Sequence, residues 1–243
     1  MKKIILFLNI FLCLNLQAND SLFVIANQDY ANQSYSLAID KYQSIISSGI
    51  ESSELYYNLG NSYYRLNEIH QAIYFYEKSL KINPNFTEAI ENLELCNQLL
   101  IDKIEKMPEI FYKIYYENLK NFLSIKWWKI TSLIFIWIYF LFYLTKILFK
   151  KRFNFSQNIL LLFSFLCFLI FQDINNDSLE KKEGIIYSQV IDIMSAPSNQ
   201  ANKLFTLHIG SKVTINDQIE DWVNISIANG NKGWVALKHL KEI

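Results

Sequence analysis

Apolar residues follow three different patterns along the chain. They recur at helical spacing up to about residue 105, form long uninterrupted runs between about residues 127 and 173, and alternate with polar residues in short stretches after residue 184. These patterns are typical of amphipathic helices, membrane-spanning helices and half-buried strands, respectively. We therefore predict a multidomain membrane protein: an all-α module, a two-helix transmembrane hairpin and an all-β small barrel.

The helical pattern repeats with a period of 34 residues. Residues 53–86 resemble a tetratricopeptide repeat, because they carry its aromatic, Leu-Gly, small, large apolar and proline positions. These positions are Tyr56, Leu59, Gly60, Tyr63, Ala72, Tyr76 and Pro84. One period earlier, the matching residues are Ala26, Ala38, Tyr42 and Ile45. One period later, Thr87 to Ile104 carries Ile90 and Leu93, but Glu94 takes the small position and no second helix follows in register.

Residues 19–105 thus resemble a tetratricopeptide repeat domain with two repeats and a capping helix. Gly60 and Ala72 are small because the two helices of a repeat are expected to touch there. Asn83-Pro84 should end the second helix, since proline disfavours a helical residue before it. We assign Tyr56, Tyr63 and Tyr76 to packing between helices.

The same resemblance implies a partner-binding groove on the first helix of each repeat. Asn27 and Asn61 lie one period apart, and in related grooves this asparagine bonds the backbone of an extended peptide. Chaperone-binding relatives add lysines that clamp a terminal carboxylate, whereas Phe23 and Tyr57 stand there in this chain. The groove-lining residues are expected to be Phe23, Asn27, Tyr30 and Ala31 in the first repeat and Tyr57, Asn61, Tyr64 and Arg65 in the second.

Residues 19–105 hold twelve acidic and five basic side chains, a net charge of −7. An aromatic-rimmed groove in a negative field suits a basic or polar segment of a partner protein. The alternative is that these polar residues only solvate that face of the helices.

The first eighteen residues have the layout of a signal peptide. Lys2 and Lys3 precede an apolar run from Ile4 to Leu16, and Ala18 is a plausible cleavage position. An uncleaved anchor helix is the alternative.

The apolar runs in the middle predict transmembrane helices at residues 127–149 and 155–173. The turn between them, residues 150–154, carries Lys150, Lys151 and Arg152, and such a basic turn is expected to be cytoplasmic. Both soluble segments then lie outside the cytoplasm, in a multi-pass protein of the cytoplasmic membrane.

Two short segments flank this hairpin. In the juxtamembrane segment, residues 106–126, the stretch from Pro108 to Ser124 fits either an amphipathic surface helix or a continuation into the first span. Residues 174–183 are expected to be a linker.

Residues 184–243 hold four of the six glycines and predict about five short strands, with a turn at Asn229-Gly230. This segment resembles the bacterial SH3 domain, on Gly233-Trp234-Val235 above all. Met194 departs from the arginine that the family usually has. Members of this family bind cell-wall peptides or protein segments. Trp222 and Trp234 would lie on such a binding face, or they pack in the core instead.

The composition offers little for catalysis or for nucleic-acid binding. Lys and Arg number 23, against 23 Asp and Glu, so no general affinity for nucleic acid is expected. Cys13, Cys96 and Cys167 fall in different segments, and the three histidines, His70, His208 and His239, accompany no nucleophile motif. We expect no enzyme activity, no catalytic residues, no metal site and no cofactor.

The order of these parts resembles the BatE-type proteins of the aerotolerance (Bat) operon. The resemblance implies a membrane-anchored scaffold that works beside the Bat proteins with von Willebrand factor A domains and a MoxR-type ATPase. The sequence therefore favours a protein-binding adaptor in stress tolerance, with cell-wall binding through the SH3 domain as the alternative.

Overall fold

The computed structural model describes residues 22–105, 107–108, 110–149, 156–180 and 182–243. The signal peptide expected at residues 1–18 and the basic turn expected at 150–154 lie outside the described residues. The chain divides into two compact units. One joins the residues up to Lys106 with those from Glu183 to Ile243, and the other runs from Met107 to Lys182.

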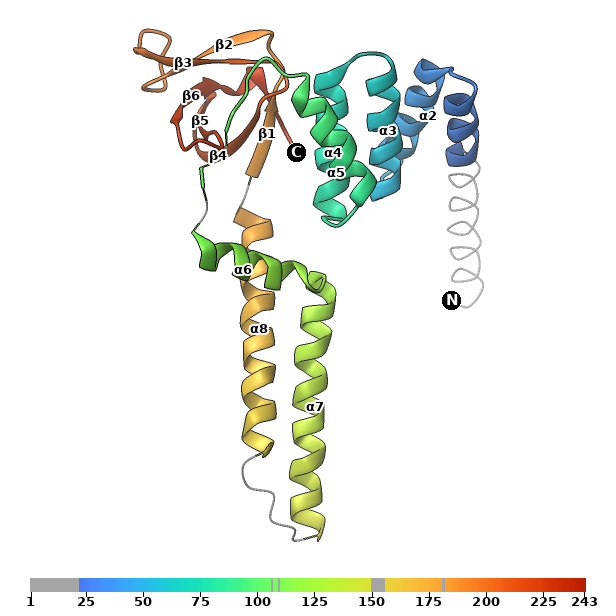
Figure 1. Ribbon diagram of the computed structural model, residues 1–243, viewed down its shortest axis with the longest axis vertical. Helices are drawn as coiled ribbons and strands as arrows, with labels where there is room; N and C mark the ends of the chain where they lie inside the picture. The colour runs from blue at the N-terminus through green and yellow to red at the C-terminus, as the bar shows by residue number, and fades with distance from the viewer. Residues whose placement is uncertain (1–21, 106, 109, 150–155, 181) are drawn as a thin grey trace, which may run out of the picture. The chain divides into compact units, whose positions relative to one another are not determined.

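Five helical segments form the repeat module, and Figure 1 shows those labelled α2 to α5 stacked side by side. Residues 22–31 precede α2 in the chain, are helical and pack against the core of the repeat module. The labelled helices are α2 (Tyr35–Ser47), α3 (Ser53–Arg65), α4 (Ile69–Ile82) and α5 (Thr87–Gln98). Helix α3 begins where the Ser52 hydroxyl accepts a hydrogen bond from the Leu55 amide, and α4 ends at Ile82, before Asn83-Pro84.

Small residues lie where the sequence placed the helix contacts. Ala26, Ala38 and Ala72 are fully buried. A Cβ added to Gly60 would lie 2.7 Å from the ring of Tyr76. The two helices of the second repeat therefore approach too closely there for any larger residue.

The C-terminal part is a seven-stranded sheet in the order β3-β2-β6-β5-β4-β1-β7. Its strands are β1 (Lys182–Ile186), β2 (Val190–Met194), β3 (Lys203–His208), β4 (Lys212–Ile219), β5 (Trp222–Ser226), β6 (Lys232–Ala236) and β7 (Leu240–Glu242), with a 3₁₀ turn, η1, at Leu237–His239. The sequence indicated about five strands. Strand β1 buries three consecutive residues instead of alternating, and β7 has only three residues, so neither gives a strand pattern.

The sheet has a hydrophobic core of its own, and it also contributes to the core of the repeat module. Ile185 of β1 is fully buried in the cluster that the repeat helices form, and Tyr187, Leu100 and Ile243 pack against it. A Cβ on Gly210 would lie 2.5 Å from Leu100, so this glycine permits close approach. The two parts form one compact unit for this reason.

The second unit holds α6 (Phe111–Asn121), α7 (Ile125–Phe149) and α8 (Ser156–Glu180). Within α7 and α8, Ile125–Thr145 and Asn158–Asn176 are long and apolar enough to cross a membrane. The two helices pack side by side (Figure 1). At their contact the hydroxyls of Ser132 and Ser164 each donate to the other's backbone carbonyl, at 3.1 and 2.9 Å.

Two helix boundaries bear on the sequence predictions: one decides between two alternatives, and the other lies beyond its predicted position. Helix α6 is separate from α7, which excludes a continuous first span through this segment. Helix α8 continues to Glu180, so residues 174–180, expected in a linker, are helical. No proline or glycine interrupts the chain between Phe171 and Gly184, so nothing there stops the helix.

Candidate partner-binding groove

Two asparagines on the first helices of the repeats make the same hydrogen bonds one period apart. Asn27 Oδ1 accepts from the hydroxyl of Tyr42 at 2.6 Å and from Nδ2 of Asn58 at 3.1 Å. Asn61 Oδ1 accepts from the hydroxyl of Tyr76 at 2.7 Å and from Nδ2 of Asn92 at 2.8 Å. All three members of the first set are spaced 34 residues from those of the second, so each set links the helices of one repeat to the next.

The tyrosines of these sets remain neutral hydrogen-bond donors. Burial raises the pKa of Tyr42 to about 12, and burial raises the pKa of Tyr76 further. Each asparagine oxygen is therefore occupied at any physiological pH. Within the part of the chain that the structure describes, Nδ2 of Asn27 and of Asn61 has no hydrogen-bond partner, so these two amide donors remain for a ligand.

Phe23 and Tyr57, predicted at the groove, are half-buried and pack against the core. The ring of Phe23 lies 5.9 Å from that of Tyr42. The ring of Tyr57 lies 4.9 Å from Phe86, and its hydroxyl accepts from Asn92 Nδ2 at 3.3 Å. These two aromatic side chains position the asparagine sets, and each leaves only part of its ring accessible.

Tyr30 and Arg65 come together through Tyr35. The ring of Tyr30 meets that of Tyr35 edge-on at 5.4 Å, and the Arg65 guanidinium lies over the Tyr35 ring at 5.1 Å. Burial raises the pKa of Tyr30, and the Arg65 charge opposes the shift. Tyr64 is 38 % exposed, and Ala31 and Arg65 are also exposed. Tyr64 and Arg65 are thus the large predicted groove side chains most open to a ligand.

Trp222 and Trp234 lie on the same face of the sheet, because Trp222 pairs with Ala236 and Trp234 with Asn224 on neighbouring strands. Both are half-buried, while Val223 and Val235, which alternate with them, are fully buried. The core positions of these two strands are therefore the valines, and the tryptophans are only partly covered. Trp222 lines a cavity of about 760 Å³ with Asp192, Met194 and His239, among others, whereas Trp234 does not line it.

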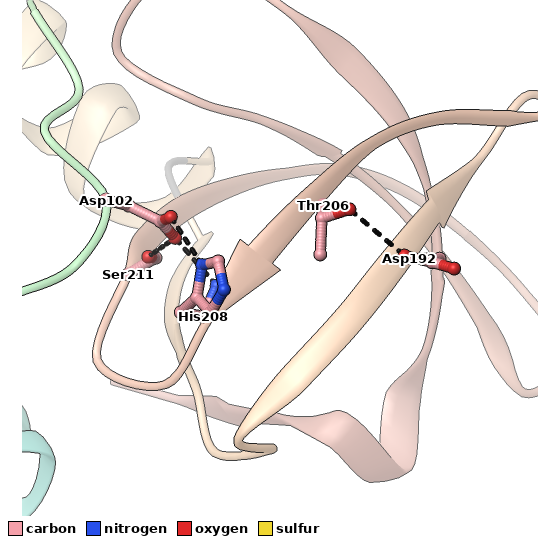
Figure 2. A network of polar contacts seen from close by, with 5 residues as sticks. All are labelled: Asp102, Asp192, Thr206, His208 and Ser211. Atoms are coloured by element: carbon pink, nitrogen blue, oxygen red, sulfur yellow. Dashed lines mark hydrogen bonds and ion pairs between the residues drawn. The ribbon is translucent and has the colours of Figure 1, made fainter.

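A polar network joins the repeat module to the sheet (Figure 2). Asp102, just after α5, accepts from the His208 ring Nδ1 at 2.7 Å, from the His208 backbone amide at 2.7 Å and from the buried Ser211 hydroxyl at 2.6 Å. In a Ser-His-Asp triad the imidazole lies between serine and carboxylate. Here the carboxylate lies between the other two, so this arrangement is a structural brace.

Two lysines of the sheet also contact the repeat module. Lys212 Nζ lies 2.8 Å from Glu77 of α4 and 2.8 Å from Glu183. Lys241 Nζ lies 4.1 Å from the ring centre of Tyr74. Burial lowers the pKa of Lys241, with a smaller contribution from the charge of Lys78. These contacts fix the sheet against α4.

Sequence reasoning missed several of these residues. Asn58 and Asn92 could have been found, because they repeat the 34-residue spacing of Asn27 and Asn61. Asp102 and Lys212 gave no such signal, since the partners of Asp102 in the sheet and the partner of Lys212 on α4 lie more than a hundred residues away along the chain.

Comparison with known proteins supports the repeat. A family model for the tetratricopeptide repeat matches residues 53–86. The chain is also similar to "Uncharacterized protein ycf37" of Pyropia yezoensis, with 32 % identity over 87 residues. That match covers 35 % of this chain and 48 % of ycf37, so the chain spans about half the length of this curated relative. Tetratricopeptide repeats are protein-interaction modules, which makes a scaffold the function class that these findings support.

Proposed function

We propose that this chain is a non-enzymatic, membrane-anchored adaptor that binds an extended segment of a partner protein across the first helices of its repeats. The observation that carries this proposal is the repeated asparagine arrangement. Two amide donors, on Asn27 and Asn61, stand one repeat apart and have no partner among the described residues. Peptide carbonyl oxygens are natural acceptors for them.

Membrane anchoring is supported by the two long apolar helices, α7 and α8. If both cross the bilayer, the chain returns to the side from which it started. The residues before and after the helices belong to one compact unit, as such a hairpin requires. The signal-peptide pattern and the basic turn of the sequence favour the extracytoplasmic side for that unit.

The C-terminal sheet is, in this proposal, of the bacterial SH3 type, and the whole chain is a BatE-like scaffold. Gly233 of the Gly-Trp-Val motif supports the domain assignment, because a Cβ there would lie 2.4 Å from Ile193 and 3.0 Å from the Met194 carbonyl. The Bat proteins with von Willebrand factor A domains are then the partners to test first.

The test uses side chains that can be removed without breaking the fold. Tyr57 and Asn61 make internal hydrogen bonds, whereas Tyr64 and Arg65 are exposed and Arg65 contacts only the face of the Tyr35 ring among the interactions described above. We therefore choose the double variant Tyr64→Ala, Arg65→Ala, with Asp40→Ala, exposed on α2, as the matched control. Membranes are solubilised, the tagged chain is captured, and co-purifying proteins are quantified by mass spectrometry. The double variant should lose its partner at least about tenfold relative to the control. Equal recovery by a folded double variant would remove this face from the mechanism.

Cell-wall binding is the second candidate function, and the cavity beside Trp222 favours it. An aromatic side chain next to the carboxylates of Asp192 and Asp221 could contact a sugar ring and its hydroxyl or amide groups. The full chain in detergent should then sediment with purified peptidoglycan. Trp222→Ala should abolish sedimentation, while Trp234→Ala, on the same face but outside the cavity, should not.

A further inference from the structure

Helix α5 has the position of the first helix of a third repeat, and the described residues that follow it form no second helix of that repeat. Asn92 of α5 bonds Asn61 of α3 as Asn58 of α3 bonds Asn27, so α5 is placed against α3 as α3 is placed against the helix of residues 22–31. After α5 the described chain has no helix before α6; residues 101–105 are irregular. The repeat therefore stops halfway.

The positions that would contact the missing helix can be read from the second repeat. There Tyr56 and Tyr63 stack on Phe75 of α4, at 6.1 and 5.4 Å, and Gly60 meets the ring of Tyr76. Leu59 completes this stripe, fully buried. One period on, the equivalent residues of α5 are Ile90, Leu93, Glu94 and Asn97.

All four of these residues line one cavity of about 870 Å³. Its other walls include Glu77 of α4, Val213 of β4, and Ile227 just after β5. The cavity thus occupies the place where a second helix of the third repeat would begin to pack. Its volume is within the range of pockets that take small ligands, so it accommodates the contacting side chains of a short helical segment, and the ends of a longer helix would extend beyond it.

The lining combines apolar side chains with an excess of carboxylates. Ile90 is 44 % exposed and Leu93 is half-buried, whereas Val213 and Ile227 line the cavity as buried side chains. The lining contains four carboxylates and two lysines, an excess of two negative charges. They are Glu77, Glu94, Asp102 and Glu183 against Lys103 and Lys212.

Glu94 is the carboxylate left for a ligand. Asp102 accepts three hydrogen bonds, and Glu77 and Glu183 share Lys212. Among the described residues, Glu94 has no ion pair, and it is exposed. It stands where Gly60 stands in the second repeat, so an aromatic residue such as Tyr76 at that place would bury the charge without a partner. A lysine or arginine would pair with it.

We propose that this cavity binds a short helical segment of a partner protein, which presents apolar side chains to Ile90 and Leu93 and a lysine or arginine to Glu94. The segment completes the third repeat from another chain. This surface is separate from the Asn27–Asn61 face, because none of the predicted groove residues lines the cavity. The adaptor therefore has a second docking site, with different partner chemistry.

The probe for this site is taken from the protein's own repeat. Two fluorescent peptides carry the α4 sequence, Ile69–Ile82, with acetylated and amidated ends, and either Tyr76→Lys or Tyr76→Glu. Their binding to the full chain in detergent micelles is measured by fluorescence anisotropy. The lysine peptide should bind at least about tenfold more tightly than the glutamate peptide. In the Glu94→Lys protein the preference should reverse.

Matched variants separate this site from other effects. Glu91→Lys makes the same charge change at an exposed position of α5 outside the cavity, and it should leave the preference unchanged. The Tyr64→Ala, Arg65→Ala variant should bind both peptides as the wild type does, so failure here is distinguishable from failure of the proposed groove. If Glu94→Lys does not fold by circular dichroism, Glu94→Gln replaces it and should bring the two affinities to within about threefold.

The inference is overturned by any of three results with folded protein. These are equal affinity for the two peptides, binding of neither peptide, and an unchanged preference after substitution of Glu94.

Discussion

Asn61 links three secondary-structure elements through a single side-chain oxygen, which accepts from Tyr76 and from Asn92. Asn61→Ala leaves the buried Tyr76 hydroxyl without an acceptor and leaves Asn92 Nδ2 only its 3.3 Å contact with the Tyr57 hydroxyl, so it should lower the free energy of unfolding by about 1–3 kcal/mol. Tyr76→Phe removes one of these donors. In the double variant Asn61→Ala, Tyr76→Phe, the loss of unfolding free energy should therefore be smaller than the sum of the losses in the two single variants. Denaturant unfolding of the full chain in micelles measures these losses.

The exposed Asn97→Ala is the control, with an expected change within about 0.5 kcal/mol. Additive costs for Asn61→Ala and Tyr76→Phe would show that the two side chains do not act together.

Cys96 should be chemically inert in the folded protein. Its side chain is fully buried, and burial raises the pKa of its thiol to about 12, which leaves little reactive thiolate at neutral pH. In a Cys13→Ser, Cys167→Ser background, iodoacetamide at pH 8 should modify Cys96 on the order of 100-fold more slowly than in urea-unfolded chain. Mass spectrometry measures the rates, and rapid labelling of folded protein would contradict the burial.

The residues at the contact between the two helices of a repeat were predictable, because their 34-residue spacing identifies the repeat. Gly60 and Ala72 are small where the helices touch, and the sequence alone showed this. The role of Asn61 was only half predictable. Its position on the helix follows from the period, but the sequence does not reveal that its oxygen serves the protein while its Nδ2 remains available.

At the scale of elements, the contact between α7 and α8 depends on two small polar residues. Ser132 and Ser164 are buried, with their hydroxyl oxygens 3.4 Å apart. Small residues with interhelical hydrogen bonds are the usual means by which apolar helices associate in a bilayer. In a Cys167→Ser background, the pair Ser132→Cys, Ser164→Cys should therefore form a disulfide on mild oxidation of membranes.

Leu133→Cys with Phe165→Cys is the control, since both side chains are exposed on this hairpin. It should give at least about fivefold less intramolecular cross-link, judged by gel mobility before and after reduction. Equal cross-linking of the two pairs would show that the helices do not pack through the serines.

Element ends were predictable wherever the chain carries a stop signal. Pro84 fixes the end of α4, whereas α8 continues beyond its expected end because no proline or glycine lies between Phe171 and Gly184. Strands with alternating burial, such as β5, agree with the alternation of apolar and polar residues that the sequence shows after residue 184. Strand β1 does not, because it is buried on consecutive positions.

At the scale of the whole molecule, Asp102 makes stability dependent on pH. Burial acts to raise its pKa, but the hydrogen bonds from Ser211 and from the backbone and ring of His208 bring the pKa below its usual value of 3.8. The folded state therefore favours the ionised form. The stabilisation is complete above the usual pKa and is lost as pH falls through the folded pKa.

Asp102→Asn should accordingly lower the unfolding free energy by on the order of 2 kcal/mol at pH 7, and the difference from wild type should shrink below about pH 4. Thermal melts between pH 7 and pH 3 measure this difference. Asp40→Asn, on an exposed helix position, should show no such pH-dependent difference. A constant deficit for Asp102→Asn at every pH would mean that its carboxylate charge is irrelevant.

The docking of the sheet on the repeats was not predictable from the sequence. Each part has its own local signal, but Asp102 and Ser211 are separated by 109 residues, and Gln71 and Tyr187 by 116. Periodicity and motifs report contacts within a few turns or one repeat, and they carry no information about which exposed face meets another part of the chain.

The compact unit that holds the repeats is discontinuous, since the chain leaves it at Lys106 and returns at Glu183. At ribosomal elongation speeds, the second portion emerges roughly 4 to 15 seconds after the first. During that interval the newly made repeats lack Ile185 and Tyr187, so part of their apolar core has no cover. The repeat module therefore cannot complete its core until residues 183–243 have been synthesised. A chaperone that shields α4 in this interval would raise the yield of folded protein.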